Sequence, residues 1–294
     1  MPARGTRNLD ELRREIDQID DRLHDLLMQR TAIVEEVSRA KNGARAEGRV
    51  QFFRPGREAS VLRRLVGRHR GPFPAASLVR VWREIMSGQL RVQTEITVAV
   101  HAPERGSRRW DLARDQYGAG ARYRRFARPQ QVVAAVRSGE AAIGVLALPG
   151  AEDEEGEEPW WPLLADDDPD TPRIFSRLPL IAAPDHAPGR DGAAALAIAF
   201  GEPDSSGRDL GCLVAECAAP ADAAALAAAA AAAGLPLRPV AAAAGGRLHL
   251  FETDGLLRAD DPRLSAAMPG ARLLPVGGYA APLETGAFRE TAYA

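Results

Sequence analysis

The chain has 294 residues, of which 46% are hydrophobic and 27% charged, and its formal net charge is −2. This composition excludes a disordered, collagen-like or disulfide-scaffold protein, and the length leaves room for two domains with their own cores. The charge is divided unevenly, because residues 1–95 carry 19 basic and 13 acidic side chains whereas the other 199 residues carry 19 and 27. The basic N-terminal third should therefore attract an anionic ligand.

The only cysteines are Cys212 and Cys217. They have no second pair and no histidine cluster nearby, so the sequence indicates neither a disulfide framework nor a metal site. The N-terminus lacks the apolar segment of a signal peptide, and no apolar run reaches the roughly 18 residues of a membrane span. We therefore expect a cytoplasmic protein with no membrane partner. The basic residues lack interleaved aromatic side chains, which argues against nucleic acid as a partner.

The first expected element is a helix over residues 9–42. Apolar residues recur there at spacings of three and four, and Asn8 with Glu11 predicts a capping box. Neither proline nor glycine interrupts this segment. At ~1.5 Å per residue the helix would be ~50 Å long. Its own small domain cannot cover that length, so we expect a second chain to pack against it.

Two further helices follow a break at residues 42–48. Pro55 begins the second helix, which ends near Gly67, and the Gly-Pro-Phe-Pro segment at 71–74 separates it from a third helix over about 75–94. The pattern thus predicts an all-α three-helix domain over residues 8–95. The side chains expected to face inward on the third helix are Leu78, Val81, Trp82, Ile85 and Met86.

Polar residues on these helices could line a site for one small anion. Arg30 and Lys41 lie on one face of the first helix, ~16 Å apart along its axis. Arg13 lies ~25 Å from Arg30 along the same axis, so it would have to reach into the site of a partner subunit. Gln89 and Gln93 share a face of the third helix. Each of these residues could instead be a solvated polar side chain of its helix.

Lys41 is the only lysine beside 37 arginines. Its ammonium group is a compact point donor, which fits a tight pocket where a planar guanidinium does not. The segment around Lys41 is one of five segments that together resemble a known family. The five segments are Leu12–Asp20, Leu26–Arg30, Arg39–Lys41, Phe53–Ala59 and Trp82–Ser87.

In this order the segments resemble the all-helical chorismate mutase family, in particular the mutase domain at the N-terminus of fused mutase and prephenate dehydratase proteins. The resemblance implies an intertwined helical dimer and the Claisen rearrangement of chorismate to prephenate, in phenylalanine and tyrosine biosynthesis. This pericyclic step moves no proton and needs no metal, cofactor or nucleophile. The protein has only to select the compact conformer of the dianion and stabilise the charge that develops in the transition state.

The resemblance also implies catalytic roles. Arg30 and the Arg13 of a partner subunit would hold the two carboxylates of chorismate. Lys41 and Gln93 would donate hydrogen bonds to the ether oxygen, where negative charge develops. Glu58 would accept a hydrogen bond from the ring hydroxyl.

Two further residues, Arg54 and Gln89, would complete the substrate-binding set, and both depart from the common pattern. Arg54 stands where some members of the family carry aspartate, and Gln89 stands where serine is common. The segment between Lys41 and Glu58 is also longer than in compact members. We expect these departures to affect affinity more than the existence of activity.

From Ile96 onward the pattern predicts an α/β lobe over residues 96–190, with strands at 96–100 and 142–148 and helices at 109–117 and 130–138. This lobe resembles a reduced prephenate dehydratase. Gly150 and Ala151 stand where that family presents Glu-Asn-Ser, and the segment Thr171–Phe175 does not reproduce its catalytic Thr-Arg-Phe. Dehydration needs a proton donor at the leaving hydroxyl, so we expect a non-catalytic lobe.

The last third, residues 191–294, resembles an ACT-type regulatory domain. A strand at 212–215, an alanine helix at 221–233 and strands at 238–243 and 248–252 give the order strand, helix, strand, strand. The Gly-Ala-Leu and Glu-Ser-Arg-Pro motifs associated with phenylalanine binding are missing, so an aromatic amino-acid effector stays a hypothesis. We expect His101 and His249 to be structural.

The sequence therefore predicts a homodimeric chorismate mutase whose C-terminal α/β region is non-catalytic. Two alternatives remain open. One is a bifunctional chorismate mutase and prephenate dehydratase, and the other is a non-catalytic regulatory partner in aromatic amino-acid biosynthesis.

Overall fold

The computed structural model describes residues 7–43, 53–103, 107–150, 158–182, 194–268 and 270–284. These residues form two compact units. The first unit contains helix α1 and residues 92–94, and the second contains the other described residues from Phe53 onward. None of the described helices combines the length and the apolar character that a membrane crossing requires.

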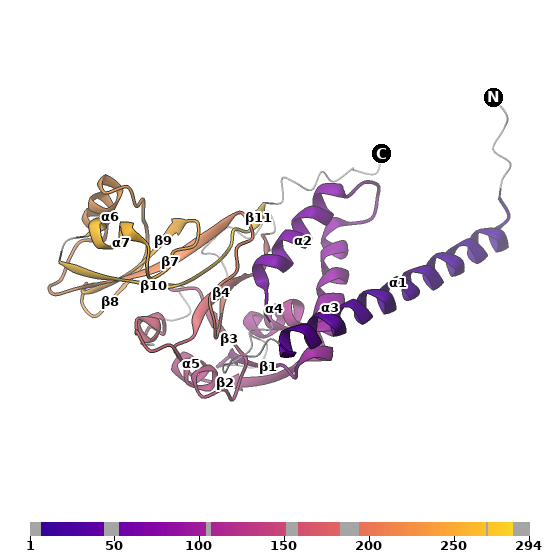
Figure 1. Cartoon of the computed structure of the whole chain (residues 1–294), viewed down its shortest axis with the longest axis horizontal. Coiled ribbons are helices and arrows are strands. Elements are labelled where there is room, and N and C mark those ends of the chain that lie inside the picture. The colour runs from indigo at the N-terminus through magenta and orange to yellow at the C-terminus, as the bar shows by residue number, and fades with distance from the viewer. Residues whose placement is uncertain are drawn as a thin grey trace, which may run out of the picture. The chain divides into compact units, whose positions relative to one another are not determined.

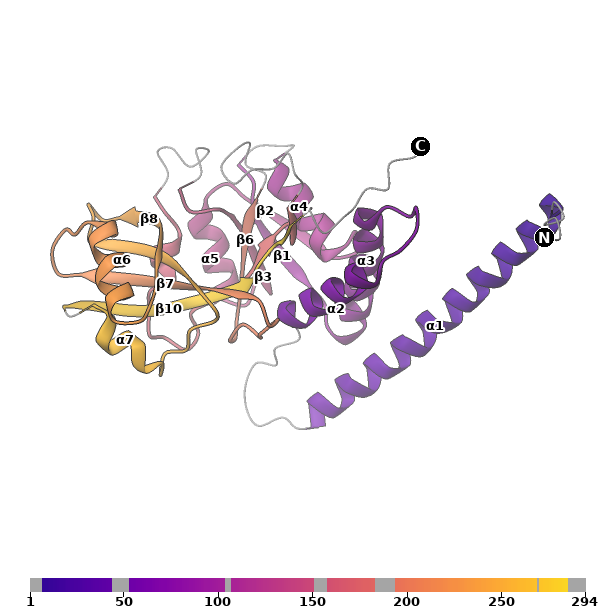
Figure 2. The ribbon, with the colours of Figure 1, turned by 90° about the horizontal axis from the view of Figure 1, so that it is seen from above.

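Helix α1 (Leu9–Gly43) is one uninterrupted helix of 35 residues (Figures 1 and 2). The capping box predicted at its start is present, because the Asn8 Oδ1 accepts from the backbone N–H of Asp10 at 3.2 Å and the Glu11 Oε2 accepts from the backbone N–H of Asn8 at 3.2 Å. The predicted long helix is thus confirmed. Most of the predicted break at 42–48 lies outside the described residues.

Helices α2 (Pro55–Arg68) and α3 (Ala75–Gln93) have nearly the predicted bounds. Their apolar sides pack on the α/β region, and the shared core holds Leu62 and Val79 of the helices beside Leu180 and Ala280. Val81, predicted to face inward, is 47% exposed instead. The prediction of a helical N-terminal region followed by an α/β region is confirmed. Because α2 and most of α3 belong to the same compact unit as the sheet, the domain boundary between 95 and 96 stays a prediction.

The second unit contains a nine-stranded sheet in the order β2-β1-β3-β6-β4-β10-β7-β9-β8. Its first part is parallel, since β1 pairs in parallel with both β2 and β3. The two helices predicted here, α4 and α5, and the two predicted strands, β1 and β3, are confirmed. The bounds of this part are β1 (Thr97–His101), α4 (Arg108–Tyr117), β2 (Arg122–Phe126), α5 (Pro129–Arg137) and β3 (Ile143–Ala147).

The middle of the sheet contains strands that the sequence pattern does not predict. Strand β6 lies between β3 and β4 and is antiparallel to both. It comes after residue 190, so the sheet continues across the predicted boundary between 190 and 191. The bounds are η2 (Trp161–Leu164), β4 (Arg173–Leu178), β5 (Ile181–Ala182), β6 (Ala195–Ala199) and β11 (Leu283–Glu284), the last of which pairs with β5.

The C-terminal part confirms the predicted order of strand, helix, strand and strand, and adds a second helix and a fourth strand. This β-α-β-β-α-β order is ferredoxin-like. The four strands lie in the order β10-β7-β9-β8, and α6 and α7 lie side by side over them (Figures 1 and 2). The bounds are β7 (Asp209–Cys217), α6 (Ala223–Ala232), β8 (Arg238–Ala243), β9 (Leu248–Asp254), α7 (Pro262–Ala267) and β10 (Ala271–Ala280).

Gly277 lies where the four C-terminal strands meet the rest of the sheet, at the contact between β10 and β4. It lies in β10 opposite Ile174 of β4, with a φ of 117°. A Cβ at this position would lie 2.1 Å from the carbonyl oxygen of Ile174. Only glycine allows both this φ and this approach of the two backbones.

Candidate active site

Glu58 lies in the first turn of α2, where it is half-buried. Burial raises the pKa of its carboxyl group to about 6, and the negative charge of Asp204 adds to this rise while the positive charge of Arg83 opposes it. Arg83 comes from α3 and is 9% exposed. Its guanidinium donates a hydrogen bond to Gln116 at the end of α4. Glu58 is therefore a carboxyl group that changes charge close to neutral pH.

A small cavity of about 10 Å³ lies beside Glu58. Its walls include Glu58, Arg83, Gln116 and Ser176, which come from four different elements. This volume has room for about one water molecule. A small-molecule site normally needs several hundred Å³, roughly 300 or more. The cavity is therefore a small polar pocket between α2, α3, α4 and β4, and it is too small to be a substrate pocket.

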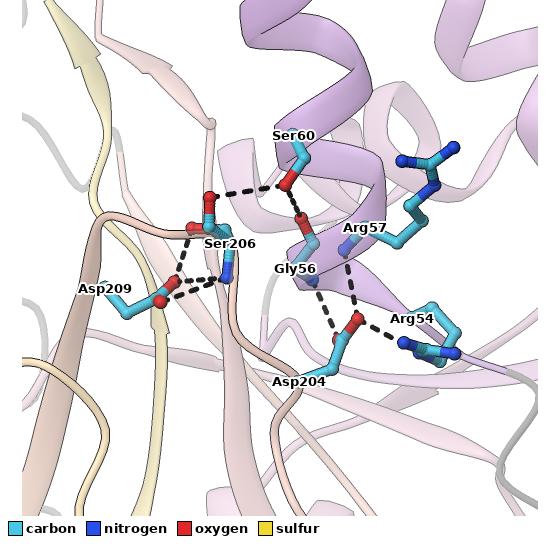
Figure 3. Close-up of polar contacts among 7 residues, drawn as sticks. All are labelled: Arg54, Gly56, Arg57, Ser60, Asp204, Ser206 and Asp209. Atoms are coloured by element: carbon cyan, nitrogen blue, oxygen red, sulfur yellow. Dashed lines mark hydrogen bonds and ion pairs between the residues drawn. The ribbon is translucent and has the colours of Figure 1, made fainter.

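Arg54 immediately precedes α2 and gives the helix no side-chain cap. The cap comes from Asp204, which lies 150 residues further along the chain than Arg54 (Figure 3). The Asp204 carboxylate accepts from the backbone N–H groups of Gly56 at 2.9 Å and Arg57 at 3.0 Å, and from the Nε of Arg54 at 3.0 Å. Sequence reasoning misses Asp204. The one signal for it is a helix start without its own Ser, Thr, Asp or Asn, which leaves N–H groups in need of an acceptor.

Helix α1 carries three predicted site residues. Arg13 is exposed, and its guanidinium lies 3.4 Å from the carboxylate of Asp10. Arg30 is half-buried. Lys41 belongs to the same unbroken helix, so the helical repeat places it on the face of Arg30. The side chain of Lys41 lies outside the described part of the chain.

The two glutamines predicted for the site lie at the end of α3. Gln89 is 6% exposed and Gln93 is the last residue of the helix. Of the predicted residues, the structure thus brings Arg54 and Glu58 together, one turn apart at the start of α2 and both under the influence of Asp204. The residues of α1 belong to the other compact unit, so their place beside Glu58 stays a prediction.

The structure also describes the surroundings of two polar side chains and both cysteines of the α/β region. The hydroxyl of Thr171 is buried and has no hydrogen-bond partner among the described residues, and His249 bonds the carbonyl oxygen of Gly246 at 2.8 Å through its Nε2. Within the described ranges no three His, Cys, Asp or Glu side chains converge on a metal-sized site. Cys212 and Cys217 are both free thiols.

Residues 12–94 match the family model for chorismate mutase type II. Two curated relatives are bifunctional chorismate mutase/prephenate dehydratases. The one from Stutzerimonas stutzeri is 33% identical over 142 residues, which is 48% of this chain and 38% of the relative. The one from Pseudomonas aeruginosa is 36% identical over 97 residues, or 33% of this chain and 27% of the relative. The aligned region thus spans well under half of either relative.

Among solved structures, the prephenate dehydratase of Streptococcus mutans aligns with 64% of this chain and 100% of its own, at 14% identity and a TM-score of 0.42. The match to the family model confirms the predicted resemblance of residues 12–94 to the chorismate mutases.

Proposed function

We propose that this protein is a chorismate mutase that converts chorismate to prephenate and works as a homodimer. The match of residues 12–94 to the mutase family supports the activity. The surface of α1 supports the dimer, since eight large apolar side chains of this helix are between 47% and 61% exposed. They are Leu9, Ile16, Ile19, Leu23, Leu26, Met28, Ile33 and Val37.

Most of these side chains follow a seven-residue repeat, which is the pattern of a helix that pairs with another helix. Ile16, Leu23 and Val37 occupy the same position of successive repeats, and Arg30 occupies that position between Leu23 and Val37. A partner helix that covers the apolar stripe would therefore also cover Arg30. In such an interface the guanidinium of Arg30 would be able to bind a carboxylate of the dianionic substrate.

The proposed site needs residues from both subunits. Arg30 and the partner subunit's Arg13 hold the two carboxylates, and bidentate guanidinium bonds fix the compact conformer. Lys41 and Gln93 stabilise the charge on the breaking ether bond. Glu58 accepts from the ring hydroxyl, which its carboxylate form does at pH values above its raised pKa of about 6. Arg54 and Gln89 line the same site.

The test is consumption of chorismate by the purified protein, followed by ultraviolet absorbance with identification of the product. We expect prephenate from the wild type. Formation of phenylpyruvate would favour the bifunctional alternative, and binding of chorismate without turnover would favour the regulatory partner.

The remaining parts of the proposal concern the cell and the C-terminal region. We place the protein in the cytoplasm, and we assign it no nucleic-acid or membrane partner. The ferredoxin-like region is the proposed place for an aromatic amino-acid effector. Titration calorimetry with L-phenylalanine and L-tyrosine tests this, and the absence of heat at millimolar concentrations would remove the effector from the proposal.

A further inference from the structure

The loop over residues 200–208, which leads into β7, contacts the start of α2. Glu58 lies in the first turn of this helix, and Arg54 immediately precedes it. Asp204 in this loop has a side chain that is only 15% exposed, and its carboxylate caps α2 through the N–H groups of Gly56 and Arg57 (Figure 3). The same carboxylate pairs with Arg54. One half-buried carboxylate thus binds both the start of α2 and the guanidinium that the mutase would use.

A second set of contacts lies one to two turns further along α2. The Ser60 hydroxyl contacts the carbonyl oxygens of Gly56 at 2.9 Å and Ser206 at 3.2 Å. The Arg63 guanidinium donates to the Ser206 hydroxyl at 2.6 Å and to the carbonyl oxygens of Arg208 at 2.9 Å and Ala281 at 2.7 Å. The loop therefore follows one side of α2 over two turns.

The loop is also tied to the ferredoxin-like part of the chain. Asp209, the first residue of β7, accepts from the backbone N–H of Ser206 at 3.0 Å (Figure 3). It also accepts from the Ser205 hydroxyl at 2.8 Å. A displacement of β7 would therefore be transmitted through Asp209 to Ser205 and Ser206, which directly follow the capping residue Asp204.

Gly56 allows the loop to approach so closely. A Cβ on Gly56 would lie 2.0 Å from the carbonyl oxygen of Asp204, whereas a Cβ on Gly67 in the same helix would have no atom within 4 Å. Both glycines lie in α2, where alanine is the better helix former. A comparison of Gly56→Ala with Gly67→Ala therefore separates two effects. Both variants put alanine into the helix, but only the first one disturbs the contact with the loop.

We infer that Asp204 is a positioning residue for the proposed mutase reaction, which holds the start of α2 so that Glu58 and Arg54 meet the substrate. The inference rests on the proposed function. It makes the ferredoxin-like region part of the active-site scaffold, because the capping carboxylate comes from the loop that opens that region. Asp204 does not touch the substrate in this scheme and acts through α2.

The experiment compares the full-length variants Asp204→Ala, Asp204→Asn and Gly56→Ala with the control Gly67→Ala. Steady-state mutase kinetics are measured well below each melting temperature. We expect kcat/KM to fall tenfold or more in the first three variants and to stay within twofold in the control. A cap that only stabilises the fold would lower the melting temperature and leave kcat/KM of the folded protein unchanged, which would overturn the inference.

Hydrogen exchange of the peptide that contains Gly56 and Arg57 gives a readout apart from activity. We expect faster exchange in Asp204→Ala than in Gly67→Ala, because two amide groups lose their acceptor. Unchanged exchange would overturn the capping role. A wild-type protein without turnover would overturn the proposed function, and an active wild type with unaffected Asp204 variants would overturn this inference alone.

Discussion

Glu58 of α2 and Arg83 of α3 line one small cavity, and they act on each other through opposite charges in a buried setting. Burial raises the pKa of Glu58 and lowers the pKa of Arg83, and the attraction between the two charges opposes both shifts. The pair places a titrating group beside the proposed substrate site. Its charge state can be followed by activity and by stability.

The activity should depend on pH through Glu58. Its pKa is raised to about 6, so the carboxylate that accepts from the substrate hydroxyl is lost as the pH falls through that value. We expect kcat/KM of the wild type to rise between pH 5 and 7, with a midpoint near 6. Glu58→Gln can accept the hydrogen bond but does not titrate, so it should show lower activity without this rise. An identical rise in both proteins would assign it to another group.

The free energy of unfolding should also depend on Glu58 and Arg83. The contribution of Glu58 to stability should fall as the pH rises, whereas the activity should rise. A carboxyl group whose pKa is raised by folding favours the folded state below its unfolded pKa and loses that contribution as the pH rises through about 6. Arg83→Ala removes the positive charge that offsets the half-buried Glu58 carboxylate, which should cost on the order of 1 to 3 kcal/mol at pH 8. The loss should be smaller at pH 5, where Glu58 is protonated.

Chemical denaturation at the two pH values measures this difference. Arg80→Ala is the matched control, because Arg80 lies one turn earlier in α3 and its side chain is 75% exposed. Removal of a solvated arginine should change stability by less than about 0.5 kcal/mol at either pH. An equal loss for Arg83→Ala at pH 5 and pH 8 would show that packing and the Gln116 contact, not the charge pair, account for its effect.

Helices with clear start and stop residues are predicted well from the sequence. Asn8, Pro55 and the Gly-Pro-Phe-Pro segment mark helix boundaries, and the observed ends lie within two residues of the predicted ones. The strand β2 is missed because its sequence, Arg-Tyr-Arg-Arg-Phe, lies at the sheet edge with three of its five side chains exposed. It therefore lacks the apolar run that marks β3. Alanine-rich β6 is missed because alanine favours helices unless tertiary contacts decide otherwise.

Some residues of the candidate site can be predicted from local sequence, and others cannot. Glu58 and Arg54 follow from a local motif, and their proximity follows from one helix turn. Asp204 does not follow from any local pattern, because its three donors lie about 150 residues away and only the folded chain brings them to it. The packing of α2 and α3 on Leu180 and Ala280 is equally non-local. Long-range contacts of this kind carry no periodicity that a single sequence displays.

Lys41 should be indispensable for turnover in the proposed mechanism. Lys41→Ala removes a donor to the ether oxygen, and by analogy with the loss of an oxyanion donor this should lower kcat by about 10²- to 10³-fold. Lys41→Arg should restore little of the activity, because a planar guanidinium does not match a point donor. Arg22→Ala, an exposed position on the same helix, is the control for general effects on α1. Near-wild-type turnover by Lys41→Ala would remove this residue from the site.

The oligomeric state should depend on the apolar stripe of α1. Leu23 is 53% exposed in the single chain, so an aspartate there should leave each chain folded and place a charge in the helix pair. We expect sedimentation to show a dimer for the wild type and a monomer for Leu23→Asp at micromolar concentration. Mutase activity should fall with it, because the partner subunit's Arg13 is lost from each site. Gln18→Asp, on an exposed polar position of the same helix, should remain dimeric and active. A monomeric wild type with full turnover would mean that one chain completes the site alone.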